Sequence, residues 1–189
     1  MLASTLRRLG LAAALAVPAA CAPAVPDSLA ADGLRSVYTS IAPDACTTVK
    51  VDLESAGSEQ DCPGVGGYGL RVLDSDARMS VTVRAPGGGE HPLNLWSIVT
   101  SAFSSLGDSV EWRVRGAEGR VVPVALVVEV LANEEPERPE AQTVYRAVAR
   151  VGPDGSCVTD RLGSDVPRAE VLRAADAASE RPCLAPGRR

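Results

Sequence analysis

Several common signatures of enzymes are missing from this sequence of 189 residues. It has one histidine, His91, and no serine in a Gly-x-Ser-x-Gly elbow, so a Ser-His-Asp triad is not indicated. The glycine run at 87–89 lacks the Lys-Ser/Thr that follows the glycines of a phosphate-binding loop. His91 itself lies in a Gly-Gly-Gly-Glu-His-Pro stretch, where an exposed loop residue is the simpler interpretation. The sequence therefore predicts no catalytic, cofactor-binding or metal-binding residue.

Positive charge is also scarce. The chain has 19 basic residues, of which one is a lysine, against 24 acidic residues, so its formal net charge is −5. Loss of a leader that contains Arg7 and Arg8 leaves 17 basic and 24 acidic residues, a net charge of −7. A protein with this balance repels phosphate backbones, and we do not expect nucleic acid as a partner.

Long apolar runs are absent beyond the N-terminal leader, so we expect no transmembrane segment. The first 24 residues have the order of a bacterial export signal. Arg7 and Arg8 precede a short apolar stretch at 9–17, and small residues with prolines follow at 18–24. This apolar stretch is too short to remain as a membrane anchor. The sequence thus predicts a periplasmic or secreted protein with residues 1–24 as its signal peptide.

Two processing routes are open for this leader. Ala22 and Ala24 form a small-x-small site for ordinary signal peptidase, which would release the protein. Cys21 is the alternative, as a lipid attachment site preceded by two alanines. Pro18 occupies the position where a lipoprotein signal has an aliphatic residue, so the sequence favours release over a lipid anchor.

Four cysteines remain after either route: Cys46, Cys62, Cys157 and Cys183. An even number of cysteines in an oxidising compartment predicts two disulfides. Sequence order permits three pairings. Loop closure favours nearest neighbours, Cys46 with Cys62 and Cys157 with Cys183, each worth about 3 kcal/mol. A four-cysteine zinc site would need closely spaced Cys-x2–4-Cys pairs, which the sequence lacks.

Hydrophobic patterning predicts one α+β domain over residues 46–184, after a lead-in at 25–45 and before a disordered tail at 185–189. Six or so strands with period-two alternation or continuous apolar runs form a mostly antiparallel meander. Stretches with such patterns lie at 48–53, 69–73, 78–84, 109–115, 121–131, 143–151 and 157–162. We expect Val49, Val51 and Leu53 to be the buried side of the first strand, with turns or loops at 54–60 and 85–92.

Helical spacing predicts two helices. A short inserted helix is expected between a cap at Asn94 and a stop at Gly107. A C-terminal helix is expected from Asp165 to about Glu180, packed on the sheet. Its apolar stripe consists of Val171, Ala174, Ala175 and Ala178.

Four arginines form a candidate ligand face: Arg113, Arg115, Arg146 and Arg150. The first two share one face of their predicted strand, and the other two share one face of theirs. If these faces coincide, a row of guanidinium groups crosses the sheet and suits carboxylate or sulfated ligands. The alternative is an ordinary solvated sheet face that Glu111 and Glu129 neutralise.

Several short segments, taken together, resemble one group of proteins. They are Cys62-Pro63-Gly64, Gly66-Gly67-Tyr68, Val110-Glu111-Trp112-Arg113, and Cys157 with a helix that closes at Cys183. In these segments residues 46–183 resemble small exported proteins of GC-rich Gram-negative bacteria, a group without an established activity. The resemblance implies two disulfides and an exported α+β domain, and it transfers no functional residue.

These observations favour a non-catalytic binding or inhibitory module of the cell envelope, with a protein or an envelope component as its ligand. The first alternative is an accessory subunit of an envelope complex. The second is a hydrolase of envelope polymers that uses dispersed carboxylates, because two such acids can lie far apart in a sequence.

Overall fold

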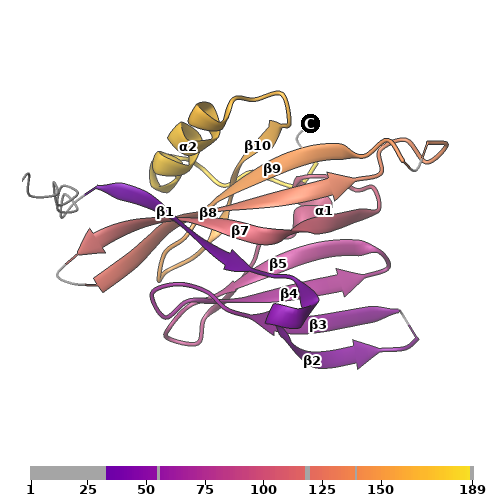
Figure 1. The fold of residues 1–189 in the computed structure, drawn as a ribbon, viewed down its shortest axis with the longest axis horizontal. Helices are drawn as coiled ribbons and strands as arrows, with labels where there is room; N and C mark the ends of the chain where they lie inside the picture. The colour runs from indigo at the N-terminus through magenta and orange to yellow at the C-terminus, as the bar shows by residue number, and fades with distance from the viewer. Residues whose placement is uncertain (1–32, 55, 118–119, 139, 188–189) are drawn as a thin grey trace, which may run out of the picture.

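The computed structural model describes residues 33–54, 56–117, 120–138 and 140–187 (Figure 1). The predicted signal peptide and Cys21 lie outside the described residues. The described strands are β1 (Leu34–Ser40), β2 (Thr47–Asp52), β3 (Gly57–Cys62), β4 (Gly69–Ser75), β5 (Arg78–Arg84), β6 (Glu90–Pro92), β7 (Ser104–Ala117), β8 (Arg120–Ala132), β9 (Thr143–Arg150) and β10 (Cys157–Gly163). The helical segments are α1 (Leu95–Ile98), α2 (Arg168–Asp176) and the 3-10 turns η1 (Pro43–Ala45) and η2 (Ala178–Glu180).

These ten strands form a single mixed sheet. Their order is β10-β9-β8-β7-β5-β4-β3-β2, with β1 paired to β7 and β6 paired to β5. Strands β5 and β7 run parallel and meet through Arg78 and Ser104, whereas the other pairs are antiparallel. The predicted antiparallel meander of about six strands is therefore wrong, because the sheet has ten strands and a parallel junction.

The additional strands lack the apolar alternation that marks a strand in a sequence. Strand β3 reads Gly-Ser-Glu-Gln-Asp-Cys in a stretch expected to be mostly turn, and β6 lies in the expected Gly/Pro loop. Strand β1 lies in the lead-in segment and pairs with β7 from Leu34 to Ser40. Backbone hydrogen bonds to neighbouring strands, rather than burial of an apolar side, define these elements.

The inserted helix is much shorter than predicted. Helix α1 has four residues, and Leu106 lies in β7, where it pairs with Val130. Asn94 has a left-handed backbone (φ 49°, ψ 47°) and its side chain caps no N–H group. The helical hydrogen bonds end with Val99 and Thr100, whose N–H groups donate to Leu95 O, and the next N–H groups have other acceptors. Ala102 N–H donates to Thr100 Oγ1, and Ser104 N–H donates to Ala77 O at the start of β7.

Two apolar layers lie on opposite faces of β8. On one face, residues of β7 and β8 pack with residues of β4 and β5 around the fully buried Trp112. On the other face lies the predicted apolar stripe, in contact with Ala125, Val127 and Val148 of β8 and β9. The stripe is divided between α2 and η2, because the helix expected to run to about Glu180 ends at Asp176 and Ala178 lies in η2. Figure 1 shows α2 above β8 and β9, with β2 to β5 on the opposite side. Coverage on both faces explains the continuous apolar run of β8.

Two disulfides lie beside the strands at the two ends of the sheet order, β2 and β10. Cys46–Cys62 joins the residue before β2 to the end of β3, and Cys157–Cys183 joins the start of β10 to the segment after η2. The two nearest-neighbour pairings favoured by the sequence are thus confirmed. Their presence fits an oxidising, extracytoplasmic compartment.

No helix among the described residues is long and apolar enough to cross a bilayer.

Candidate functional site

The β7–β8 ladder is interrupted by a bulge. Leu106 pairs with Val130 and Val110 pairs with Val128, so residues 107–109 of β7 stand opposite Glu129 alone. Gly107 permits this close approach, since a Cβ at that position would lie 3.3 Å from the Cβ of Glu129. Bulges redirect side chains and are common beside functional sites.

The three bulge residues line a cavity of about 230 Å³. Strands β1, β8 and β9 and the first turn of α2 supply the other walls. Tyr38, Val127 and Val171 contribute its apolar and aromatic surface. Its charged residues are Asp108, Glu111, Glu129, Arg146 and Arg168.

One wall of the cavity is a half-buried ion pair. Glu111 has 7% of its side chain exposed and binds both terminal nitrogens of Arg168, at 2.9 and 3.0 Å. Arg168 also donates to the hydroxyl of Tyr38 at 2.5 Å. Hydrogen bonding to the Glu111 carboxylate, followed by its charge, raises the pKa of Arg168 above its ordinary value. In this bidentate pair the two charges neutralise each other, so neither group needs a ligand as a partner.

The ion pair continues into a network beneath α2. Ser36 Oγ donates to Glu111 and accepts a hydrogen bond from Arg113 Nη1 at 2.8 Å. Arg113 Nε donates to Asp176 Oδ1 at 2.7 Å. Because Arg168 and Asp176 are the first and last residues of α2, the network ties both ends of this helix to β1 and β7.

The sheet register places the four predicted arginines on one face. Arg113 and Arg150 flank Ala125, and Arg146 lies opposite Glu129. Arg113 is only 7% exposed and is held by Asp176 and Ser36, and Arg146 alone among the four lines the cavity. Arg115 is exposed and Arg150 half-buried, both outside the cavity lining. Ligand binding by this set stays a prediction.

The cavity contains charges that the protein itself does not satisfy. Arg146 makes two long hydrogen bonds, both of 3.5 Å, to the carbonyl oxygens of Gly163 and Ser164. Opposite charges across neighbouring strands usually interact, yet no ion pair joins Glu129 to Arg146. Within the described ranges, the carboxylates of Glu129 and Asp108 have no hydrogen-bond or ion-pair partner.

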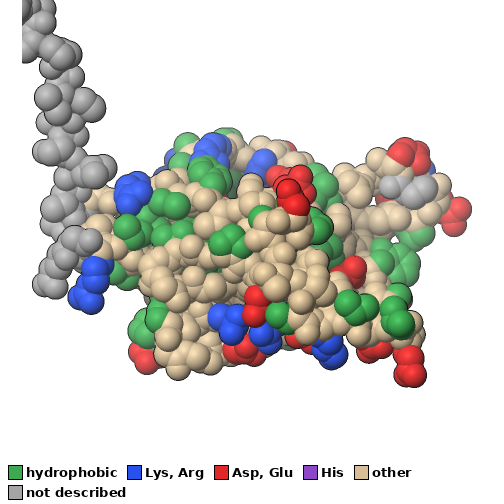
Figure 2. All heavy atoms as spheres, turned by 60° about the horizontal axis from the view of Figure 1, so that its bottom comes forward, with side chains coloured by type: hydrophobic (Ala, Val, Ile, Leu, Met, Phe, Trp, Pro, Cys, Tyr) green, Lys and Arg blue, Asp and Glu red, His purple; other side chains and the backbone are tan. Residues whose placement is uncertain are grey.

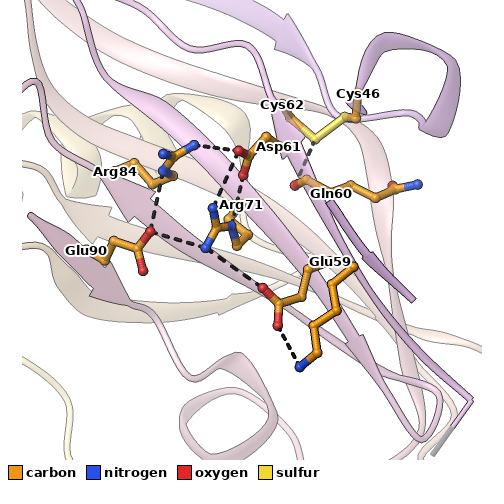
Figure 3. Close-up of polar contacts among 9 residues, drawn as sticks. Cys46, Glu59, Gln60, Asp61, Cys62, Arg71, Arg84 and Glu90 are labelled. Carbon is orange, nitrogen blue, oxygen red and sulfur yellow. Dashed lines mark hydrogen bonds and ion pairs between the residues drawn. A yellow bond between two sulfur atoms is a disulfide. The ribbon is translucent and has the colours of Figure 1, made fainter. Parts of the chain in front are cut away.

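A second set of charges lies on the face of β3 to β6 (Figure 3). Arg71 and Arg84 both bind Asp61, at 2.8 and 2.7 Å, and both approach Glu90, at 3.2 and 3.5 Å. The hydrogen bond from Arg71 is the main cause of a lowered pKa at Asp61. Figure 2 shows basic and acidic side chains interleaved on this side of the molecule. Each of these groups has an opposite partner, so the cluster serves as a structural ion-pair network.

His91 lies in β6, and its Nε2 is buried without a hydrogen-bond partner in the described part of the chain. Over the same residues, no group of three or more His, Cys, Asp or Glu side chains could hold a metal ion.

Sequence reasoning missed most of the cavity. It treated Glu111 and Glu129 as neutralising charges and did not connect Asp108 or Arg168 with them. One signal was present: Gly107-Asp108-Ser109 interrupts the apolar pattern between Leu106 and Val110. A polar glycine-containing interruption inside a strand is typical of a bulge.

No protein family matches the chain, and no curated protein and no solved structure is similar to it. The resemblance to small exported proteins of GC-rich bacteria therefore stays a prediction.

Proposed function

We propose that this protein is an exported, disulfide-stapled binding domain of the cell envelope that holds a small ligand in the cavity at the β7 bulge. Its two disulfides support the extracytoplasmic part of this proposal. The observation that carries the binding part is that Glu129 and Arg146 face each other across neighbouring strands without an ion pair between them. Glu129 has no partner among the described residues, and Arg146 makes only two long hydrogen bonds to carbonyl oxygens. Charged groups left without partners in a cavity favour a ligand that supplies them.

The charges indicate the chemistry of the ligand. Arg146 offers a planar guanidinium to a carboxylate, while Glu129 and Asp108 offer acceptors to an ammonium group. A small zwitterion, such as an amino acid or the free end of a short peptide, carries both groups. The volume of about 230 Å³ lies below the range of about 300–1,000 Å³ typical of pockets for drug-sized ligands, which favours a ligand of this size.

Titration of the ¹⁵N-labelled protein with the dipeptide alanyl-alanine tests the proposal. We expect saturable shifts of backbone amides at 107–109 and at the start of α2. Arg146→Ala and Glu129→Gln should each weaken binding about tenfold, since each removes one charge-assisted contact. Arg150→Ala, a change on the same strand outside the cavity lining, is the matched control and should leave binding unchanged.

Absence of saturable shifts with alanyl-alanine, or equal binding by wild type and Arg146→Ala, would refute binding of a zwitterion at the bulge. Equal weakening by Arg150→Ala and Arg146→Ala would instead assign the ligand to the wider arginine face.

A further inference from the structure

The chain has two tryptophans, which differ in their surroundings. Trp112 is fully buried, and its indole Nε1 donates to Thr39 Oγ1 at 2.9 Å. Trp96 is half-buried, and among the described residues nothing accepts a hydrogen bond from its indole. Tryptophan combines a large apolar surface with one polar N–H group that normally finds a partner when buried. Trp96 thus retains both an accessible ring and an unused donor.

The backbone conformation just before α1 sets the direction of the Trp96 side chain. Asn94 has the left-handed conformation that asparagine tolerates better than most residues. The next residue, Leu95, is fully buried, and its N–H donates to Ser80 Oγ at 3.0 Å. Consecutive residues of a helical turn point about 100° apart, so anchoring Leu95 in the core directs Trp96 away from the core.

Trp96 forms one wall of a groove of about 230 Å³ beside β2, β3 and β4. Leu73 supplies a second apolar wall, and Lys50, Asp52, Glu59 and Asp74 supply polar groups. Glu59 contacts Lys50 at 3.3 Å and Arg71 at 3.8 Å, and Figure 3 shows the contact that links it to Arg71 of the ion-pair network. One carboxylate of the groove therefore has two cationic partners.

Asp74 has acceptor capacity that the described residues do not use. Its Oδ1 is buried and has no hydrogen-bond partner among them. A buried acceptor without a partner is costly, and a donor from a ligand would offset that cost. The groove thus combines an aromatic ring, an aliphatic side chain, one unused donor and one under-used acceptor.

We propose that this groove binds one hexose ring of an uncharged glycan. The apolar C–H face of the ring packs on Trp96 and Leu73. Ring hydroxyls donate to Asp74 and accept from the indole N–H. A sugar supplies donors, acceptors and an apolar face together, which matches this mixed lining.

The net negative charge of the groove lining excludes anionic sugars as ligands. The groove has three carboxylates, Asp52, Glu59 and Asp74, against the single ammonium of Lys50, so sulfated or uronic sugars are repelled. A quaternary ammonium could stack on the indole, but it would leave the indole N–H and Asp74 without partners. The small volume fits one ring, for which we expect a dissociation constant of ~1 mM.

Saturation-transfer difference NMR with cellobiose and N,N′-diacetylchitobiose tests the proposal on the folded protein. We expect transfer to the ring C–H protons of at least one disaccharide, and none to glucuronic acid or choline. Trp96→Ala should weaken binding about tenfold, and Asp74→Asn should weaken it several-fold. Trp96→Phe should recover part of the loss. The matched control is Phe103→Ala, an aromatic residue 50% exposed and outside this groove, which should bind as wild type.

No transfer to either disaccharide at concentrations of about 20 mM, well above a dissociation constant of ~1 mM, would overturn the proposal. Equal binding by Trp96→Ala and wild type would also overturn it, as would transfer to choline alone. If circular dichroism shows that Trp96→Ala is unfolded, Trp96→Phe and Asp74→Asn decide the outcome. Arg146→Ala should leave sugar binding unchanged, so this test is independent of the bulge cavity.

Discussion

At the scale of single residues, the contact between Glu111 and Arg168 joins two groups with very different exposure. The Glu111 side chain is 7% exposed and the Arg168 side chain is 60% exposed. Removal of the arginine leaves a buried carboxylate with Ser36 as its remaining partner, whereas removal of the acid leaves an arginine that water can solvate. The burial of one partner therefore decides which substitution costs more.

We predict that Arg168→Ala lowers the free energy of unfolding by about 2–3 kcal/mol and Glu111→Gln by about 1–2 kcal/mol. Urea denaturation at pH 7 measures both values. An equal or reversed order of the two losses would contradict the burial of Glu111.

Asp61 gives a prediction about pH. Arg71, mainly by hydrogen bonding, and the charge of Arg84 lower the pKa of Asp61 below 3.8 in spite of partial burial. Because the folded pKa lies below the unfolded value, ionised Asp61 stabilises the fold above about pH 3.8, and this stabilisation is lost as pH falls through the folded pKa. Asp61→Asn removes it at any pH.

The free energy of unfolding of wild type should exceed that of Asp61→Asn by about 1 kcal/mol at pH 7. Urea unfolding curves between pH 7 and pH 2 should show this difference shrinking below the ordinary aspartate pKa of 3.8. A difference that stays constant over this range would show that the charge of Asp61 does not contribute.

The sequence revealed some of these residues and not others. Cysteine pairing was predictable because short loops favour neighbouring cysteines. The ion pair of Glu111 with Arg168 joins residues 57 positions apart in β7 and α2, and no local pattern records such a contact. Arg146 was identified from its strand face, but its neighbour Glu129 was interpreted as a neutralising charge.

At the scale of elements, α2 packs through small side chains. Ala175 is 1% exposed and lies against β8 and β9, whereas Ala169 of the same helix is exposed. Ala175→Leu should lower the free energy of unfolding by about 1–3 kcal/mol, because a close-packed site has no room for three more carbons. Ala169→Leu, the matched control, should change it by less than about 0.5 kcal/mol. Thermal or urea unfolding compares them, and equal stability of the two variants would show that α2 is not closely packed.

Element prediction depended on what covers each strand. The continuous apolar run of β8 correctly indicated a strand covered on both faces. In β2 the alternation indicated a strand, but Val51 of this strand and Leu53 directly after it are 62% and 90% exposed rather than buried. Strand β2 ends the sheet, and a register shift lies between Thr48 and Lys50. Alternation marks the two sides of a strand, but it does not specify whether another layer covers either side.

At the scale of the whole molecule, the parallel junction of β5 with β7 was not predictable. A single residue pair, Arg78 with Ser104, joins these strands, and β6 and α1 lie between them in the sequence. Hydrophobic periodicity records local conformation and burial, whereas the choice of a distant strand partner depends on the packing of the entire core. The same limit explains why the bulge cavity, built from five elements, was not assembled from the sequence.

We propose that this polypeptide is exported and that its four remaining cysteines form two disulfides. Intact-mass spectrometry of the protein from its own host, with thiol alkylation before and after reduction, measures both the processing of the N-terminus and the state of the cysteines. We expect a chain that lacks its first 24 residues, or one lipidated at Cys21, with no alkylated thiol until reduction exposes four. A chain that begins at Met1 and is alkylated at its cysteines without reduction would contradict it.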